Sequence, residues 1–202
     1  MSIQSSELVW RRCTESSDLP TNGGRATSVA IASNVKNNVF PDLSQSERTT
    51  GLTRYRKAAL HVASSQNLRL MNPSIFVETF TPGGDSVVFF PGTATDTQSS
   101  IAGTERTYGA GNLDADVSIG ASSITVMTEG ASLDYFRDGD WIRISSKATV
   151  DAVSGVTESQ QISGAPSYSG DVATITVAGT LNSGFSAVDT RVSSVYLSLI
   201  HI

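Results

Sequence analysis

The side chains that first suggest general-base or nucleophilic chemistry are two histidines and one cysteine, in a chain of 202 residues. His201 lies beside the C-terminus, which leaves His61 as the candidate base. On a strand, His61 would alternate with Leu60 and Val62, so we expect it on the outer face of a sheet. Cys13 would need a lowered thiol pKa and an orienting partner, and its sequence neighbours offer neither. The sequence therefore predicts no catalytic site, and Cys13 is expected to be a small packed side chain.

A second group of candidates is acidic. Asp134, Asp138 and Asp140 lie close together in the sequence, and calcium binds carboxylate oxygens in such loops. The spacing does not fit an EF-hand, however, and no closing glutamate follows. We favour a turn, in which Gly139 supplies the bend and the aspartates bond backbone amides, over a ligand site. Trp141 follows Asp140 directly, so Asp138, Asp140 and Trp141 together form the candidate ligand-or-turn group. No metal or other cofactor is predicted.

Basic and aromatic side chains interleave at Arg54, Tyr55 and Arg56, a combination that serves single-stranded nucleic acid in some proteins. On a strand, Arg54 and Arg56 share one face and Tyr55 points to the other, so only half of the cluster would meet any one partner. We instead expect two exposed arginines that contact carboxylates of a neighbouring subunit, because guanidinium groups pair with carboxylates through two hydrogen bonds.

The charge content limits the partners. Charged residues make up 16% of the chain, below the ~25% of an average soluble protein, which argues mildly against a helix-rich cytosolic enzyme. The net charge of -5 would repel a phosphate backbone, so no nucleic acid is expected as a partner. The N-terminal residues lack a signal-peptide pattern, and no apolar run approaches the ~20 residues of a membrane span. We therefore expect a soluble chain without a leader or a membrane partner.

The elements that must position these residues are predicted to be strands. In the first half of the chain, β-branched and aromatic runs alternate with turns rich in Gly, Asn and Pro. The runs are residues 7–12, 26–32, 53–63, 74–80 and 86–90. One helical turn is expected over residues 43–50, with Ser44 as N-cap, Glu47 completing a capping box and Gly51 ending it.

Apolar residues alternate more regularly in the second half. Ile124 and Val126 share one side of the run 123–127, and Ile142 and Ile144 share one side of the run 141–144. This is the period of a half-buried strand. Residues 171–178 and 190–196 repeat the pattern, and four or five such strands suit a small barrel or sandwich.

Charge also divides the chain. Ten basic and nine acidic residues precede Gly109, whereas four basic and ten acidic residues follow it. The boundary falls in residues 108–112, a Gly-rich stretch typical of linkers. We therefore predict an all-β protein, with a β-sandwich-like domain over residues 1–108 and a small β-barrel or sandwich domain over residues 109–196.

The end of the chain, residues 197–202, has a sequence of a different kind. Leu-Ser-Leu-Ile-His-Ile is one translation of CTG TCT CTT ATA CAC ATC, which resembles a transposon end used in preparing sequencing libraries. We predict that residues 197–202 are a non-native tail and that the natural protein continues past Tyr196. Strands missing from a truncated reading frame would leave an open sheet edge.

A resemblance to a known class of proteins rests on segments of the first half. Residues 37–42 read Asn-Asn-Val-Phe-Pro-Asp, residues 47–57 read Glu-Arg-Thr-Thr-Gly-Leu-Thr-Arg-Tyr-Arg-Lys, and residues 72–78 contain Ile-Phe-Val. This order resembles structural proteins of tailed bacteriophages, without distinguishing head, neck, tail or baseplate, and implies assembly rather than catalysis. The resemblance in the first half extends over residues 90–93, 96–98 and 103–106. In the second half, residues 136–144 look like the small β-barrel modules inserted in virion proteins.

Two functions follow from these observations. The first is a structural subunit of a tailed-phage virion, assembled in the host cytoplasm and held by contacts with other virion proteins and with copies of itself; a single cysteine fits that reducing compartment. The alternative is a receptor- or glycan-binding module, in which exposed Trp141, Tyr135 and Tyr168 stack on sugars. A hydrolase is not expected, because the sequence offers no convincing base or nucleophile.

Overall fold

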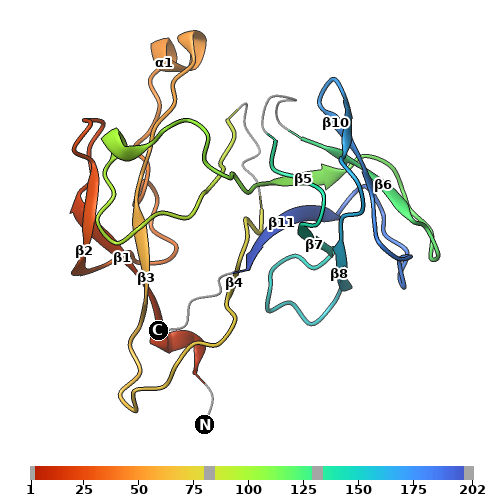
Figure 1. The fold of residues 1–202 in the computed structure, drawn as a ribbon, viewed down its shortest axis with the longest axis horizontal. Helices are drawn as coiled ribbons and strands as arrows, with labels where there is room; N and C mark the ends of the chain where they lie inside the picture. Colours follow the sequence, from red (N-terminus) through yellow and green to blue (C-terminus); the bar gives the residue numbers. More distant parts are fainter. Residues whose placement is uncertain (1–2, 80–84, 129–133, 198–202) are drawn as a thin grey trace. The chain divides into compact units, whose positions relative to one another are not determined.

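The structure is a computed structural model that describes residues 3–79, 85–128 and 134–197. Most of the regular secondary structure in these residues is strand, so the all-β prediction is confirmed. None of the helices among them has the length and apolar character needed to span a membrane. The chain forms two compact units (Figure 1). Unit 1 comprises residues 3–71 and 91–105, and unit 2 comprises residues 72–79, 85–90, 106–128 and 134–197.

Unit 1 is built on an antiparallel sheet with the strand order β2-β1-β3. The central strand, β1 (Leu8–Glu15), follows a 3-10 turn, η1 (Ser5–Glu7), and pairs with β2 (Gly23–Ala30) and β3 (Ala58–Val62). The register of β1 and β3 sets Trp10 opposite Leu60 and Leu8 opposite Val62. Side chains directly opposite each other point to the same side of a sheet, so these four apolar residues share one face.

Hydrogen bonds connect segment 91–105 to the rest of unit 1. Gln98, at the start of the 3-10 turn η2 (Gln98–Ser100), donates its backbone N–H to the carbonyl of Asn22 at 2.7 Å. The Lys57 ammonium donates to the carbonyls of Gly24 and Asp96, both at 2.9 Å. These bonds hold the segment to the start of β2, although the two lie far apart in the sequence.

A short helix, α1 (Gln45–Thr50), forms where the sequence predicts one helical turn. Ser44 is its N-cap: the Ser44 hydroxyl accepts from the Glu47 backbone N–H, and the Glu47 carboxylate accepts from the Ser44 N–H at 2.7 Å. Gly51, with a φ of 74°, ends the helix. The predicted capping box and its glycine stop are therefore confirmed.

Unit 1 has almost no hydrophobic core. Among its described residues, Cys13 is the one apolar side chain that is buried, as expected of a small packed residue. Burial raises the pKa of the Cys13 thiol, against the opposite effect of the Lys57 ammonium. A chain segment of this size normally buries much more apolar surface. Larger apolar side chains of unit 1 remain exposed: Leu8, Trp10, Leu19, Val29, Val35, Val39, Phe40, Leu43, Leu52 and Met71.

Unit 2 is an eight-stranded antiparallel sheet with the order β8-β7-β11-β5-β6-β10-β9, and β4 pairs with the end of β11. The strands are β4 (Ser74–Ile75), β5 (Ala110–Leu113), β6 (Ser123–Met127), β7 (Trp141–Ser145), β8 (Thr157–Gln161), β9 (Ser167–Ser169), β10 (Val172–Thr176) and β11 (Arg191–Leu197). The long strand β11 lies between β5 and β7 and then continues along β4. It therefore pairs with three other strands of the unit.

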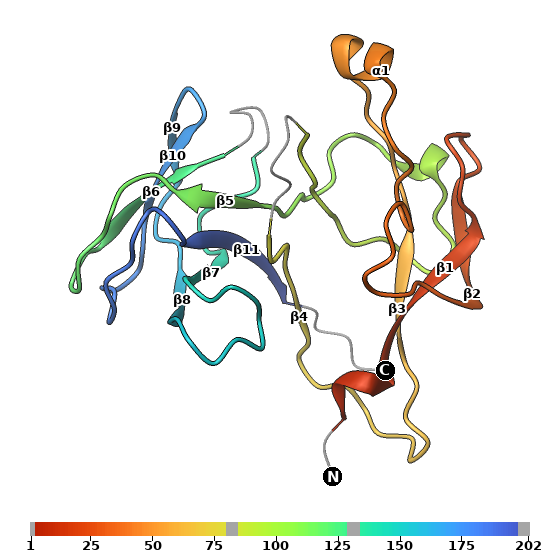
Figure 2. The ribbon, with the colours of Figure 1, turned by 180° about the vertical axis from the view of Figure 1, so that it is seen from behind.

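This sheet closes on itself in the manner of a small barrel. Just beyond β8 and β10, Ile162 forms an antiparallel bridge with Val177. Ala178 donates its N–H to the Gln161 carbonyl at 2.8 Å, and Ser163 donates to the Thr176 carbonyl at 2.9 Å. The ends of β8 and β10 thus pair across what would otherwise be an open sheet, and Figure 2 shows the strands surrounding a common centre.

The core of unit 2 follows the alternation seen in the sequence. Ile124 and Val126 of β6, and Ile142 and Ile144 of β7, are at most 3% exposed. Ala173 and Ile175 of β10 and Val192 of β11 join the same apolar cluster. Burying one such side chain stabilises a fold by roughly 1.5–3 kcal/mol relative to leaving it in water. Unit 2 therefore has the apolar core that unit 1 lacks.

The interpretation of residues 108–112 as a linker is wrong. Residues 110–113 form β5, which is paired with β11 on one side and β6 on the other. Ala110, Gly111 and Leu113 are buried. Gly109 lies against the Tyr135 ring, where a Cβ atom would be 3.1 Å from the ring carbons. Glycine here permits close packing rather than flexibility.

The chain passes between the two units three times within the described residues, whereas the sequence predicted a single boundary. Residues 72–79 and 85–90 belong to unit 2 because β4 pairs with β11 and because Phe89 and Tyr108 exchange backbone hydrogen bonds. The Phe89 and Tyr108 rings stack with centroids 5.3 Å apart. The last passage, between residues 105 and 106, lies near the predicted boundary.

The predicted C-terminal tail is only partly covered by the structure. Leu197 is the last residue of β11 and pairs with Ser74. Residues 198–202 lie outside the described residues. The origin of the tail stays a prediction.

Candidate interaction surfaces

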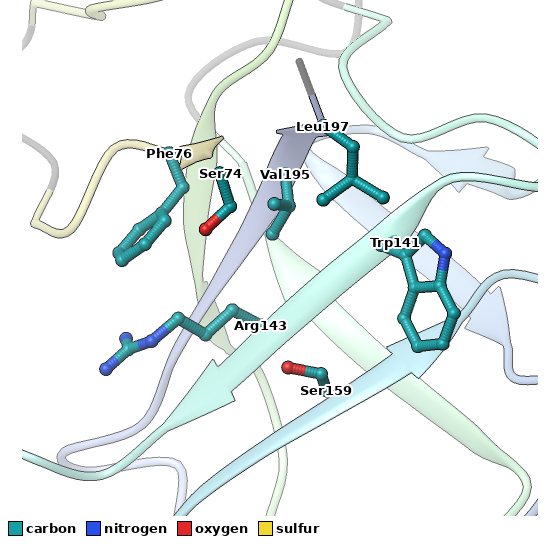
Figure 3. A pocket seen from close by; sticks show the side chains of 7 residues that line it. All are labelled: Ser74, Phe76, Trp141, Arg143, Ser159, Val195 and Leu197. Atoms are coloured by element: carbon teal, nitrogen blue, oxygen red, sulfur yellow. The ribbon is translucent and has the colours of Figure 1, made fainter. Parts of the chain in front are cut away.

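A shallow pocket of about 150 Å³ lies on the outer side of unit 2. Residues of β7 alternate here: Ile142 and Ile144 point into the core, so Trp141 and Arg143 point outward. Figure 3 shows the Trp141 ring at one end of the pocket, and Phe76 with the Arg143 guanidinium at the other. The pocket is lined by Ser74, Phe76, Trp141, Arg143, Ser159, Val195 and Leu197.

Arg143 gives this pocket a cation that is partly withdrawn from water. Its guanidinium carbon lies 4.9 Å from the centroid of the Phe76 ring, a cation–π contact. Burial lowers the pKa of Arg143, while the nearby Glu78 carboxylate acts in the opposite direction. An aromatic plane and a fixed positive charge therefore lie side by side on an open surface.

Of the three aromatic residues predicted to stack on sugars, Trp141 alone presents its side chain, with 41% exposed. Tyr135 is 1% exposed and packs edge-to-face on Phe136, with ring centroids 5.5 Å apart. Tyr168 is half-buried against the core, and burial raises the pKa of its hydroxyl. The expectation that both tyrosines are exposed is wrong, because Tyr135 is part of the core of unit 2 and Tyr168 packs partly buried against it.

The carboxylates of Asp138 and Asp140, just before Trp141, form hydrogen bonds and an ion pair within unit 2. Asp138 accepts the backbone N–H of Gly164 at 2.7 Å, and Asp140 accepts that of Arg137 at 2.9 Å and pairs with Arg106. Gly139, with a φ of 81°, lies at the bend. The structure thus places these aspartates in a turn. Within the described residues, no group of three or more His, Cys, Asp or Glu side chains is arranged to hold a metal ion.

The arginines of the first half are engaged within unit 1. Arg56 donates to Asp18 at 2.7 Å, and Arg54 bonds Glu47 at 2.6 Å and lies 3.3 Å from Asp18. The side chains of Arg54 and Arg56 are 13% and 7% exposed. The expectation that they are exposed is wrong, because residues 51–57 are not a strand and the carboxylates come from the same unit.

The role of these arginines in contacts between subunits stays a prediction. Tyr55 is half-buried, and its carbonyl accepts from the Asn22 side chain at 2.8 Å and from the Arg56 guanidinium at 2.6 Å. The pairing with Arg56 lowers the pKa of Asp18. The three candidate residues therefore stabilise the fold of unit 1.

His61 and Cys13 do not form a nucleophile–base pair. His61 is exposed on β3 opposite Val9, as its position in the sequence predicts. Cys13 lies four residues beyond Val9 on β1, about 13 Å away at the rise of an extended strand. The strand register therefore separates the two groups that nucleophilic catalysis would need together.

The sheet of unit 1 carries an open apolar strip, here called the Trp10 face, formed by Leu8, Trp10, Leu60 and Val62. Trp10 is 42% and Leu8 is 37% exposed, and Leu60 and Val62 are half-buried. Arg12 is the next β1 residue on this side, and it donates to the Asn38 side-chain oxygen at 2.6 Å. The strip therefore ends at Arg12.

Comparison with known proteins gives little. No protein-family profile and no curated protein matches this chain. Two solved structures overlap it in part: the Gp54 tailspike of Acinetobacter baumannii bacteriophage AP22, in complex with A. baumannii capsular saccharide, and the Pseudomonas phage phi297 tailspike gp61. Their identities are 19% and 20% and their TM-scores 0.32 and 0.33, and each match covers 43% of this chain and 14% of that chain. Similarity at this level carries no information on function.

The sequence identified Trp141 but missed the residues around it. Arg143 could have been found, because the same alternation that buries Ile142 and Ile144 turns Arg143 outward with Trp141. Phe76 gives no such signal, since its contact with Arg143 depends on the pairing of β4 with β11. The Trp10 face likewise depends on the register of β1 with β3.

Proposed function

We propose that this chain is part of a structural protein of a tailed-phage particle and acts through contacts with neighbouring subunits rather than through catalysis. The observation that carries the proposal is the burial pattern of unit 1: among its described residues, one apolar side chain, Cys13, is buried, whereas Trp10, Leu8 and many others are exposed. Exposed apolar surface on this scale is typical of interfaces. A neighbouring subunit that covers it would supply the core that unit 1 lacks.

The segments that resemble phage structural proteins support this proposal. In the structure, segment 47–57 builds part of the framework of unit 1: Glu47 caps α1, and Arg54 and Arg56 fix Asp18. These residues hold loops together and expose no reactive group. A framework of this kind suits a protein whose task is to present surfaces.

The test is the presence of the protein in particles. Particles of the phage that encodes the chain are purified by density gradient, and mass spectrometry then measures its copy number against a known capsid protein. A fixed stoichiometric copy number, with incomplete particles when the gene is deleted, is the expected result. Complete, infectious particles that lack the protein would reject the proposal.

Receptor or glycan binding is the second candidate, favoured by the pocket at Trp141. An exposed indole beside the Arg143 cation could stack on a sugar ring while the cation binds an acidic substituent. A glycan array probed with the wild type, with Trp141→Ala and with Trp10→Ala tests it. Binding that is lost only in Trp141→Ala supports this function, and absence of binding by the wild type rejects it.

A further inference from the structure

We propose that the Trp10 face packs against the Trp10 face of a second copy of this chain, with the two β1 strands antiparallel about a two-fold axis. The inference rests on the proposed function and names one of the surfaces and partners that it requires. The two arms of the contact are identical, as in most soluble homodimers.

The first step is the geometry of the strip. Because Leu8 is opposite Val62 and Trp10 is opposite Leu60, the four side chains form a continuous apolar surface across two strands. Cys13, the buried residue of β1, occupies an odd-numbered position and therefore points to the other side of the sheet. The packing around Cys13 thus leaves the Trp10 face open.

The second step is the distribution of charge around the strip. The strip itself contains no charged residue, so two copies can meet without burying an unpaired charge. Glu7 precedes Leu8 at one end of the strip, and Arg12 lies at the other. An antiparallel two-fold arrangement sets the acidic end of one copy against the basic end of the other, whereas a parallel arrangement sets like charges together.

The third step is a comparison with the other exposed tryptophan. Trp141 has nearly the same exposure, 41% against 42% for Trp10. Its surroundings include the Arg143 cation. If the Trp141 pockets of two copies packed against each other, two guanidinium groups would therefore be brought together in a small apolar area. The Trp10 face is therefore the surface that suits a second copy of the chain.

Because the chain has two tryptophans, one in each unit, the test uses two single-tryptophan variants of the full chain. In Trp141→Phe the emission reports on Trp10, and in Trp10→Phe it reports on Trp141; phenylalanine keeps an apolar ring at each site. Emission and acrylamide quenching are measured from about 1 µM to about 100 µM, where moderate dimers form. Sedimentation velocity gives the oligomeric state at each concentration.

Dimerisation accompanied by a blue shift and about twofold weaker quenching of Trp10, with Trp141 unchanged, is the expected result. A second pair of variants separates assembly from folding. Trp10→Arg should be monomeric while Trp141→Arg still dimerises, and circular dichroism checks that both remain β-rich.

Several results would overturn the inference. These are a monomer at every concentration, a dimer in which Trp10 stays equally quenched, a shift of Trp141 instead, or an assembly of another order. The proposed function has its own test in purified particles, so a chain that is present there at fixed copy number but never buries Trp10 would reject the two-fold contact alone.

Discussion

Gly111 of β5 lies so close to Met127 of β6 that a Cβ atom on Gly111 would overlap the Met127 carbonyl oxygen. The same atom would lie 2.8 Å from the Val126 side chain. Because Val126 and the neighbouring strands form the core of unit 2, neither neighbour can withdraw cheaply. The backbone of β5 can therefore reach its place between β6 and β11 only without a side chain at this position.

We predict that Gly111→Ala lowers the free energy of unfolding of unit 2 by about 1–3 kcal/mol, the range for overpacked cores, or by more if β5 separates. Gly179→Ala is the matched control, because its Cβ would be 3.8 Å from the nearest atom outside its chain neighbours. Urea unfolding of both variants in the Trp10→Phe background, where emission reports on Trp141, measures the two changes. Equal stability of the two variants would contradict the close approach of β5 and β6.

The same residues show what the sequence can predict. Strands β6 and β7 were found because Ile124 with Val126, and Ile142 with Ile144, alternate with polar residues. Strand β5 has no such pattern: in Ala-Gly-Asn-Leu the signal is masked by the glycine that packing requires. Its pairing is a long-range property, and local sequence indicates a turn instead.

Polar strands were missed for a related reason. Strand β8 reads Thr-Glu-Ser-Gln-Gln, so it offers no apolar face, and its place in the sheet comes from its pairing with β7. The candidate sites show the same limit. Trp141 could be read from its neighbours, whereas the partners of Arg54 and Arg56 could not, because Asp18 approaches them only in the folded chain.

Glu158 of β8 is directly opposite Ile144 of β7, so the two side chains lie on the same side of the sheet. The Glu158 carboxylate holds the loop at residues 180–183 in place through hydrogen bonds. It accepts the backbone N–H groups of Asn182 at 2.9 Å and Ser183 at 3.1 Å. Burial opposes its ionisation, but these hydrogen bonds prevail and lower the pKa of Glu158. Its contribution to stability is therefore fully present above the unfolded value near 4.5 and is lost as the pH falls through the lower folded value.

We predict that Glu158→Gln costs about 1–3 kcal/mol at pH 7, because the amide NH₂ group cannot accept from the loop. The variant should also lose part of the decline in stability that the wild type shows below pH 4.5. Urea unfolding at pH 7 and at steps below pH 4.5 measures both effects. Wild type and variant with parallel pH curves would show that Glu158 does not carry this dependence.

The pairing of Asp18 with Arg56 and Arg54 should be measurable in unit 1. Asp18 is 53% exposed, so water screens the pairs, and we expect Asp18→Asn to destabilise unit 1 by no more than about 1 kcal/mol. Hydrogen bonding to Arg56 lowers the pKa of Asp18, so this contribution is present above the unfolded value near 3.8 and disappears as the pH falls further.

Asp42→Asn is the control for Asp18→Asn, because Asp42 pairs with Lys36 at 3.6 Å where both side chains are more than two-thirds exposed. That change should have no measurable effect. Thermal unfolding of Trp141→Phe protein, in which Trp10 reports on unit 1, compares the two variants at low and high salt. A loss that is the same for both, or that grows with salt, would argue against the ion pairs as its source.

Cys13 offers a direct measure of how weakly unit 1 is held. Its thiol is buried in a unit with almost no other apolar core, so we predict that it becomes accessible through local opening well before unit 2 unfolds. Ellman's reagent should modify Cys13 in native buffer about tenfold or more slowly than in denaturant, since burial and a raised thiol pKa both protect it. The free energy of opening from this rate should nevertheless fall below that from hydrogen exchange of amides in β6 and β7.

If a second copy covers the Trp10 face, the labelling rate of Cys13 should also fall as the protein concentration rises, because the contact stabilises the sheet that carries Cys13. Protection of Cys13 equal to that of the unit 2 amides, even in dilute protein, would mean that unit 1 is stable without a partner.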